Sequence, residues 1–240
     1  MRRRFFVDQF SGDTAAIEGE TAHHLGRVLR AQPGQLYELS DGQHVRLGRV
    51  ENVARDRIDF ALLDDIPAYE SVIHITLLLA VVKFDAFEWA IEKATELGVS
   101  AIVPLSTARS EKALLAAAAK RAERWRKILA EASQQSRRIR IPALQSLSQP
   151  AQAFAACADT RLKVMLSERP DAPALRQVLP AGTAQKRAVL AIGPEGGWTE
   201  AEFAAAHASS FREASLGKLI LRTETAVTAA LASLNYALAD

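Results

Sequence analysis

The sequence predicts an α/β protein with a small β domain over residues 1–68 and a larger α/β domain over residues 69–240. Two observations support this division. The first third consists of short apolar runs separated by turn residues, whereas the rest alternates strand-like and helix-like segments. Such alternation is typical of a mainly parallel sheet with helices on both faces.

The N-terminal third is predicted to form a small antiparallel barrel with one short helix near residues 21–30. Asp41-Gly42 separates two apolar runs, and an Asp-Gly pair in that position is a good hairpin signal. Pro67 and its polar neighbours mark the expected boundary between the domains. The expected strands cover residues 36–39, 45–50 and 58–63.

The larger domain is predicted to start with a strand and a helix. The unbroken apolar run 72–82 is rich in β-branched residues, as in a strand covered on both faces. The helix expected at 84–97 has Gly98 in the stop position. Thr199 and Glu202 have the spacing of a capping box, which predicts a helix start there. Further strands are expected at 99–105, 162–166, 188–192 and 211–216, and further helices at 112–137 and 224–239.

The composition excludes several classes of protein. Hydrophobic residues make up 49% and charged residues 24% of the chain, so disorder is not expected. Cys157 is the only cysteine, which excludes a disulfide framework or a cysteine-rich zinc site and favours a reducing cytoplasm. The histidines lack metal-ligand spacing, so no metal is expected. The apolar run 72–82 is too short to span a membrane, and the first residues lack the apolar run of a signal peptide.

Positive charge is unevenly distributed along the chain. The formal net charge is only +2, but residues 120–140 carry eight basic and two acidic side chains, a local balance of +6. Residues 1–68 use nine arginines and no lysine, and the planar guanidinium suits phosphate. A solvated helix face, together with an arginine-favouring genome, is the better explanation of these charges on composition alone.

Two segments depart from the local pattern and are the candidate ligand loops. Residues 192–198, IGPEGGW, directly follow a predicted strand, and their glycines let backbone amides approach a ligand. They match neither a Walker loop nor the dinucleotide fingerprint, and a tight strand-to-helix turn remains an alternative. Residues 215–226 hold an apolar loop that we expect to be buried, either around a ligand such as adenine or as a plug of the core by Leu219, Ile220 and Leu221.

Seven blocks of the sequence together carry a family resemblance. They are RRFF at 3–6, HHLGRVLR at 23–30, EKATELGV at 92–99, PLSTARS at 104–110, ERWRKILAEASQQSRR at 123–138, IGPEGG at 192–197 and LGKLILRTETA at 216–226. In this order they resemble the 16S ribosomal RNA (uracil-N3)-methyltransferase family, RsmE, of the SPOUT class. The resemblance covers nearly the whole chain, and seven ordered blocks are far more specific than one glycine loop. Trp198 stands where phenylalanine is commoner in the family.

The resemblance implies a PUA-like N-terminal barrel, a trefoil knot in the larger domain, and S-adenosylmethionine as cofactor. The residues that it implies for cofactor binding are Leu166, Ile192, Gly193, Pro194, Glu195, Gly196, Gly197, Leu216, Gly217, Ile220, Leu221, Arg222, Thr225 and Ala226. For RNA we expect contacts, mostly to phosphate, from Arg3, Arg4, Arg27, Arg30, Arg109, Arg137 and Arg138.

The implied reaction is methylation of N3 of a uridine in 16S ribosomal RNA, within the small ribosomal subunit. No catalytic base is identified; the candidates for the base or for a cation that stabilises the uridine anion are Arg109, Arg137, Glu195 and Glu224. The resemblance also implies a homodimer. Competing hypotheses are a SPOUT ribose 2′-O-methyltransferase, a non-catalytic RNA-binding assembly factor, and a conventional Rossmann enzyme, whose glycine loop should instead follow the first strand.

Overall fold

The computed structural model describes residues 3–68, 71–179 and 187–238. The chain forms two compact units, an N-terminal unit of Met1–Glu70 with Ser133–Ile141 and a C-terminal unit of Ser71–Ala132 with Pro142–Asp240. The sequence predicts a single boundary after residue 68. The short second segment, Ser133–Ile141, joins the N-terminal unit because the Ser40 hydroxyl and the Arg4 guanidinium donate hydrogen bonds to its backbone carbonyls.

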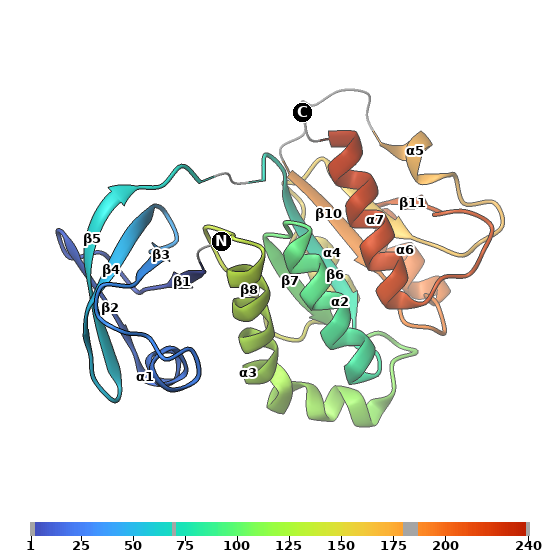
Figure 1. The fold of residues 1–240 in the computed structure, drawn as a ribbon. Coiled ribbons are helices and arrows are strands. Elements are labelled where there is room, and N and C mark those ends of the chain that lie inside the picture. Colours follow the sequence, from blue (N-terminus) through green and yellow to red (C-terminus); the bar gives the residue numbers. More distant parts are fainter. Residues whose placement is uncertain (1–2, 69–70, 180–186, 239–240) are drawn as a thin grey trace. The chain divides into compact units, whose positions relative to one another are not determined.

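The N-terminal unit is built on one five-stranded sheet in the order β1-β3-β4-β5-β2 (Figure 1). All its pairs are antiparallel except β1 with β3, which is parallel, so the prediction of a purely antiparallel barrel is wrong at this edge. The helix expected near residues 21–30 is one α-helical turn, α1, followed by a π-helix. The elements are β1 Arg4–Phe6, β2 Thr14–Glu18, α1 Gly19–His23, η1 His24–Val28, β3 Leu36–Ser40, β4 Val45–Val53 and β5 Arg57–Asp65.

The C-terminal unit contains a six-stranded sheet in the order β11-β9-β10-β6-β7-β8. Every described strand pair in it is parallel, which confirms the predicted mainly parallel sheet. The strands are β6 His74–Ala80, β7 Ala101–Leu105, β8 Ala143–Leu144, β9 Leu162–Leu166, β10 Arg187–Ile192 and β11 Arg212–Ala214.

Helices cover both faces of this sheet, as predicted, and Figure 1 shows α2 and α7 side by side on one face. Leu77 and Leu190 point into a core formed with α2, α3 and α7, whereas Leu78 and Val189 point into a second core with α4 and α6. This alternation follows from the period of two along a strand. The helices are α2 Phe84–Glu96, α3 Lys112–Gln135, α4 Pro150–Ala155, α5 Leu175–Val178, α6 Glu200–Ala208 and α7 Thr223–Leu238.

The parallel strands direct their carboxyl ends to the same edge of the sheet, where the chain leaves each strand in a loop. Ligands of open α/β sheets bind at that edge. The trefoil knot implied by the resemblance stays a prediction. No helix in the described part of the chain is long and apolar enough to cross a membrane.

Candidate active site

A cleft of about 540 Å³ lies at the carboxyl ends of β9, β10 and β11, within the C-terminal unit. This volume is within the range of small-molecule sites. The two candidate ligand loops form much of its wall, and of the residues expected to bind the cofactor, all but Thr225 line it. Ser215 and Lys218 of the predicted loop 215–226 line it too. The sequence did not point to several further lining residues, which come directly after β9 or from the start of α6: Ser167, Glu168, Arg169, Glu200 and Phe203.

The glycine loop after β10 packs so tightly that a side chain at two of its positions would force neighbouring side chains to move. A Cβ on Gly193 would lie 3.0 Å from Cε2 of Trp198, and a Cβ on Gly196 would lie 3.3 Å from Cβ of Arg109. Gly197 has a φ of +71°, which favours glycine. The glycines therefore keep the loop backbone close to its neighbours on one side while it lines the cleft on the other.

Trp198 forms the support beneath this loop. Its indole ring is buried, and its Nε1 donates a hydrogen bond of 2.9 Å to the backbone carbonyl of Leu166 at the end of β9. The ring also meets Phe154 of α4 edge-on, at 6.0 Å between centroids. Trp198 thus connects the ends of β9 and β10, which pair in the sheet.

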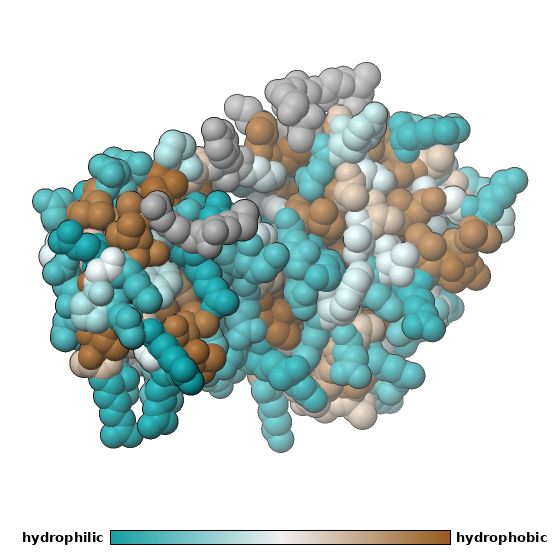
Figure 2. Space-filling model, in the orientation of Figure 1, coloured by the Kyte–Doolittle hydropathy of each residue, from teal (hydrophilic) through white to brown (hydrophobic). Residues whose placement is uncertain are grey.

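The apolar loop after β11 is not buried as expected. Leu219 and Ile220 are 84% and 78% exposed, so the prediction of a buried loop is wrong for them, and so is the alternative that they plug the core. Figure 2 shows apolar surface where Figure 1 places the loop between β11 and α7. Leu216 does pack partly against the core. The loop is therefore anchored at its start and exposed along its middle.

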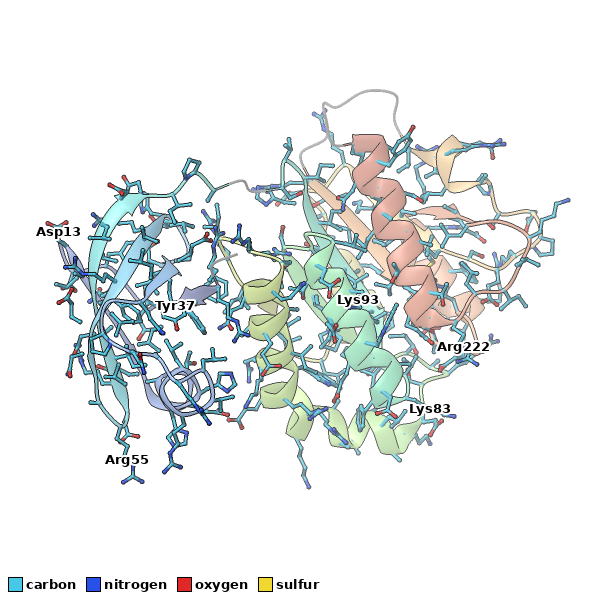
Figure 3. All side chains as sticks on the ribbon, viewed as in Figure 1. Asp13, Tyr37, Arg55, Lys83, Lys93 and Arg222 are labelled. Carbon is cyan, nitrogen blue, oxygen red and sulfur yellow. The ribbon has the colours of Figure 1, made fainter. Side chains whose placement is uncertain are left out.

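The two ligand loops approach each other at the start of α7. The Thr223 hydroxyl donates a 3.5 Å hydrogen bond to the Gly193 carbonyl. Figure 3 labels Arg222, which directly precedes α7, beside this point. The glycine loop (192–198) and the apolar loop (215–226) thus border one cleft, although the 16 residues 199–214, which include α6 and β11, lie between them in the sequence.

Arg109 lies over the glycine loop. Its Nη1 donates a 2.6 Å hydrogen bond to the carbonyl of Gly196. The turn that carries it is also held by Ser110, whose hydroxyl donates to the Val81 carbonyl at the end of β6, and by the Glu202 carboxylate, which accepts from the amide of Ala108. The cleft wall therefore includes a guanidinium held by neighbouring loops.

A second guanidinium, of Arg169, borders the cleft. It stacks 3.7 Å from the Phe203 ring centroid and donates a 2.5 Å hydrogen bond to Glu200. This hydrogen bond lowers the pKa of Glu200 and raises the pKa of Arg169, so both remain charged at neutral pH. The pair gives this side of the cleft mouth no net charge.

The catalytic candidates are distributed unevenly. Arg109 and Glu195 line the cleft, whereas Glu224 lies half-buried in the first turn of α7 and is not part of the lining. Arg137 belongs to the N-terminal unit, as does Arg138. Among the residues that the structure describes, no cluster of three or more His, Cys, Asp or Glu side chains could hold a metal ion.

The arginines expected to bind RNA in the N-terminal unit divide into two groups. Arg3, Arg27 and Arg30 are exposed. Arg4 is only 4% exposed; it pairs with the buried carboxylate of Glu38 at 2.9 Å and donates to the Arg137 carbonyl. The expectation that Arg4 grips phosphate is therefore corrected, because its guanidinium is used inside the unit.

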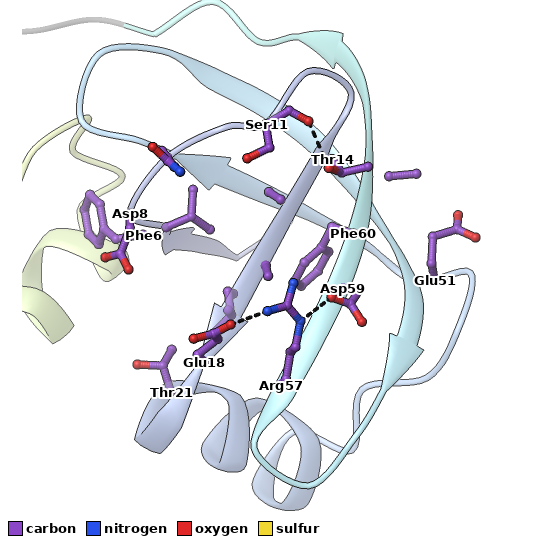
Figure 4. A pocket seen from close by; sticks show the side chains of 16 residues that line it. Phe6, Asp8, Ser11, Thr14, Glu18, Thr21, Glu51, Arg57, Asp59 and Phe60 are labelled. Atoms are coloured by element: carbon purple, nitrogen blue, oxygen red, sulfur yellow. Dashed lines mark hydrogen bonds and ion pairs between the residues drawn. The ribbon is translucent and has the colours of Figure 1, made fainter.

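A second hollow, of about 660 Å³, lies on the N-terminal unit (Figure 4). Its charged lining is mainly acidic, since the single guanidinium of Arg57 already pairs with Glu18 and Asp59. Asp8 and Glu51 add further negative charge to the lining. Phosphate groups would be repelled there, which makes this hollow an unsuitable RNA site.

Comparison with known proteins identifies the class. A family model described as an RNA methyltransferase domain matches residues 69–235, and one described as an RNA methyltransferase PUA domain matches residues 17–63. The ribosomal RNA small subunit methyltransferase E of Synechocystis sp. is 34% identical, over 95% of this chain and 75% of the relative. The protein of the same name from Bacillus subtilis is 33% identical, over 93% of this chain and 90% of the relative.

A solved structure agrees with these matches. A ribosomal RNA small subunit methyltransferase E from Neisseria gonorrhoeae, bound to S-adenosyl methionine, matches with a TM-score of 0.89 at 30% identity, over 99% of this chain and 98% of the relative. Fold and sequence are thus those of an RNA methyltransferase. The chain belongs to the ribosomal RNA small subunit methyltransferase E family, and the resemblance to RsmE is confirmed.

Proposed function

We propose that this chain transfers a methyl group from S-adenosylmethionine to N3 of a uridine in 16S ribosomal RNA of the small subunit, in the cytoplasm. The observation that carries the proposal is the cleft of about 540 Å³ between the two ligand loops, in a chain of this family. The Neisseria gonorrhoeae relative, whose fold is similar over 99% of this chain, binds the same cofactor.

The residues of the cleft fit this cofactor. The glycine backbone packs closely against Trp198 and Arg109 and forms a cradle on the cleft side, and a Cβ on Gly193 or Gly196 would displace these two neighbours. Residues 193–197 and 216–222 would hold the cofactor through backbone groups and the apolar side chains of Leu216 and Leu221. When bound, S-adenosylmethionine supplies an electrophilic methyl group on a sulfonium.

The protein must orient the uridine and deal with the proton on N3. We assign Arg109 to the stabilisation of the uridine anion, because its guanidinium already lies on Gly196 in the cleft wall. Glu195 lines the same wall and is the better of the two candidate bases, since Glu224 lies outside the lining. Orientation of the nitrogen toward the methyl group supplies the rest of the acceleration.

Substitution of the two cleft residues tests these roles. Arg109→Ala should lower kcat by about 100-fold, the usual loss when one anion-stabilising donor is removed. Calorimetric titration of each variant shows whether cofactor affinity is preserved. Glu195→Gln should lower kcat in the same way if Glu195 is the base. Unchanged turnover would remove the residue concerned from the mechanism.

For RNA, we propose that residues 1–68 form a PUA-like domain that grips phosphate. Of the arginines expected to contact RNA, Arg3, Arg27 and Arg30 are exposed in this domain, and we add Arg137 and Arg138 from the same unit and Arg109 from the cleft. Phosphate contacts position the strand without reading its sequence. Loss of one such arginine should therefore weaken binding to any RNA and reduce its salt dependence.

We further propose that the chain acts as a homodimer whose partner chain completes the active site. The exposed apolar side chains of Leu219 and Ile220 on the cleft loop, and of Tyr236 on α7, support this proposal, because a dimer interface would cover them. Sedimentation or light scattering at working concentration tests it. A monomer that is fully active would overturn it.

The first experiment is a calorimetric titration with S-adenosylmethionine. Gly196→Arg adds a long side chain where even a Cβ is crowded by Arg109, and it should abolish saturable binding. Ala155→Arg, on an exposed position of α4, is the matched control and should bind as the unaltered protein does. No binding by the folded, unaltered protein would favour the RNA-binding assembly factor instead.

Identification of the modified nucleoside distinguishes the proposed uracil-N3 methyltransferase from a ribose 2′-O-methyltransferase. Digestion of methylated RNA followed by mass spectrometry separates N3-methyluridine from a ribose methyl, which stays with the sugar when the base is released. Recovery of 2′-O-methyluridine would replace the proposed reaction by that of the alternative ribose methyltransferase.

A further inference from the structure

Glu202 is a buried carboxylate in the first turn of α6 that the proposed mechanism does not use. It is 7% exposed, and both of its oxygens accept hydrogen bonds. One oxygen, Oε2, accepts from the amide and the hydroxyl of Thr199, at 2.8 and 2.9 Å. This half of the arrangement is an ordinary capping box at the start of a helix.

The other oxygen does something that a capping box does not require. Oε1 accepts a 2.9 Å hydrogen bond from the backbone amide of Ala108, in the turn that follows β7. In the sheet β6 lies between β7 and β10, so the strands that lead into these two loops do not pair with each other. The carboxylate therefore joins two loops across the end of an intervening strand.

Arg109 directly follows Ala108 in the sequence. The hydrogen bond between Glu202 and the Ala108 amide, called the bridge below, therefore also restrains Arg109. Arg109 reaches the glycine loop through its hydrogen bond to the Gly196 carbonyl, and its side chain packs on the Gly196 backbone. The turn is also attached through Ser110 to the Val81 carbonyl and through Ser106 to the Ser148 carbonyl. The contacts of Ala108 with Glu202 and of Arg109 with Gly196 are the ones that fix where the Arg109 guanidinium lies relative to the glycine loop.

We infer that Glu202 is a positioning residue for methyl transfer, which holds the Ala108 amide so that Arg109 stays over the glycine loop. The inference rests on the proposed function, in which Arg109 stabilises the uridine anion. Because an ionised carboxylate accepts at both oxygens, it satisfies the amides of Ala108 and Thr199 together. A neutral amide side chain offers one accepting oxygen and satisfies only one of them.

The variant Glu202→Gln tests this inference with two readouts. Hydrogen exchange of the Ala108 amide should become faster, because this amide loses its acceptor or keeps it only part of the time. The kcat for methyl transfer should fall by about tenfold or more, as expected for loss of a hydrogen bond to a charged group. Affinity for S-adenosylmethionine, measured by calorimetry, should change by less than about threefold, which corresponds to the low end of the net contribution of one hydrogen bond.

Thr199→Val is the matched control. It removes the capping hydroxyl from the same helix start but leaves the contact between Glu202 and Ala108 in place. Both variants should lower the melting temperature, whereas only Glu202→Gln should slow turnover. An equal loss of kcat in Thr199→Val would mean that the helix cap matters rather than the bridge, and would overturn the inference.

A double-mutant cycle with Arg109→Ala shows whether Glu202 acts through Arg109. If it does, Glu202→Gln should cause little further loss of kcat once Arg109 is absent. Multiplicative losses would overturn the inference. If the unaltered chain transfers no methyl group, the proposed function fails. Hydrogen exchange tests the contact between Glu202 and Ala108 independently of activity. Unchanged exchange of the Ala108 amide in Glu202→Gln would overturn the inference by itself.

Discussion

The residue that most shapes the cleft is Trp198, which lies beneath the glycine loop. A phenylalanine ring could fill the same space against Gly193 and Phe154, but it has no N–H to donate to the Leu166 carbonyl. In this chain the carbonyl already has one partner before any cofactor arrives. A carbonyl can accept a second hydrogen bond, so Leu166 can still contribute to binding.

Trp198 should report cofactor binding by fluorescence. Of the three tryptophans it alone lines the cleft, since Trp125 is buried in the core with α2 and Trp89 is an exposed residue of α2. Titration with S-adenosylmethionine should change the emission of the unaltered protein, and Trp198→Phe should abolish that change. Trp89→Phe is the control and should leave it intact. A full signal in Trp198→Phe would mean that the cofactor binds elsewhere.

At the scale of elements, the best predicted segments were those with strong local signals. The strand expected at 162–166 is β9 Leu162–Leu166, and the capping box at Thr199 starts α6 as expected. Local sequence carried no comparable signal for β8, a two-residue strand that depends on pairing with β7 about 40 residues earlier, or for the π-helix, a rare variant of the expected helix. The exposure of Leu219 and Ile220 was missed because apolar character predicts burial without saying whether a surface within the same chain supplies it.

The pairing of Arg4 with Glu38 is an element-scale feature, since it fastens Ser133–Ile141 to the sheet of the N-terminal unit. Glu38 lies between two guanidiniums, with Oε2 at 2.9 Å from Arg4 and Oε1 at 3.4 Å from Arg137. Arg137 has a φ of +57°, a conformation that needs support from its surroundings. The buried carboxylate supplies part of that support.

Glu38→Gln should lower the free energy of unfolding by about 3–5 kcal/mol, because it leaves the buried charge of Arg4 without its counter-ion. Urea denaturation measures this loss. RNA affinity should fall as well, through Arg137 and Arg138, whereas cofactor affinity should not. Glu51→Gln removes an exposed partner of Arg49 and should cost less than about 1 kcal/mol. Equal losses in the two variants would contradict the role given to Glu38.

At the scale of the whole molecule, the chain passes between the two units three times, near residues 70, 132 and 141. The sequence predicted one passage, because Pro67 is marked by turn residues whereas the other two passages lie at the end of a helix and just beyond it. A knot in the C-terminal unit is implied by family resemblance alone, because chains rarely thread loops and local sequence patterns do not predict one.

A fragment of residues 1–70 should therefore fold poorly on its own. It lacks Ile139, whose carbonyl accepts from the buried Ser40 hydroxyl, and Arg137, whose carbonyl accepts from Arg4. Circular dichroism and urea titration should show a weak or broad transition. Fusion of residues 133–141 to this fragment through a flexible linker should restore cooperativity. A sharp transition in the unfused fragment would contradict this expectation.

The second segment of the N-terminal unit also sets an order of events during synthesis of the chain. Domains usually fold as units while the chain emerges from the ribosome, the N-terminal one first. Here the N-terminal sheet is translated by residue 65, but Ser133–Ile141 follows only after two helices and two strands of the other unit. Until that segment is made, the N-terminal unit is incomplete, because Arg4 and Glu38 lack their contacts to Arg137. In an enzyme proposed to act on ribosomes, completion of the RNA-gripping unit thus depends on how far a ribosome has read its message.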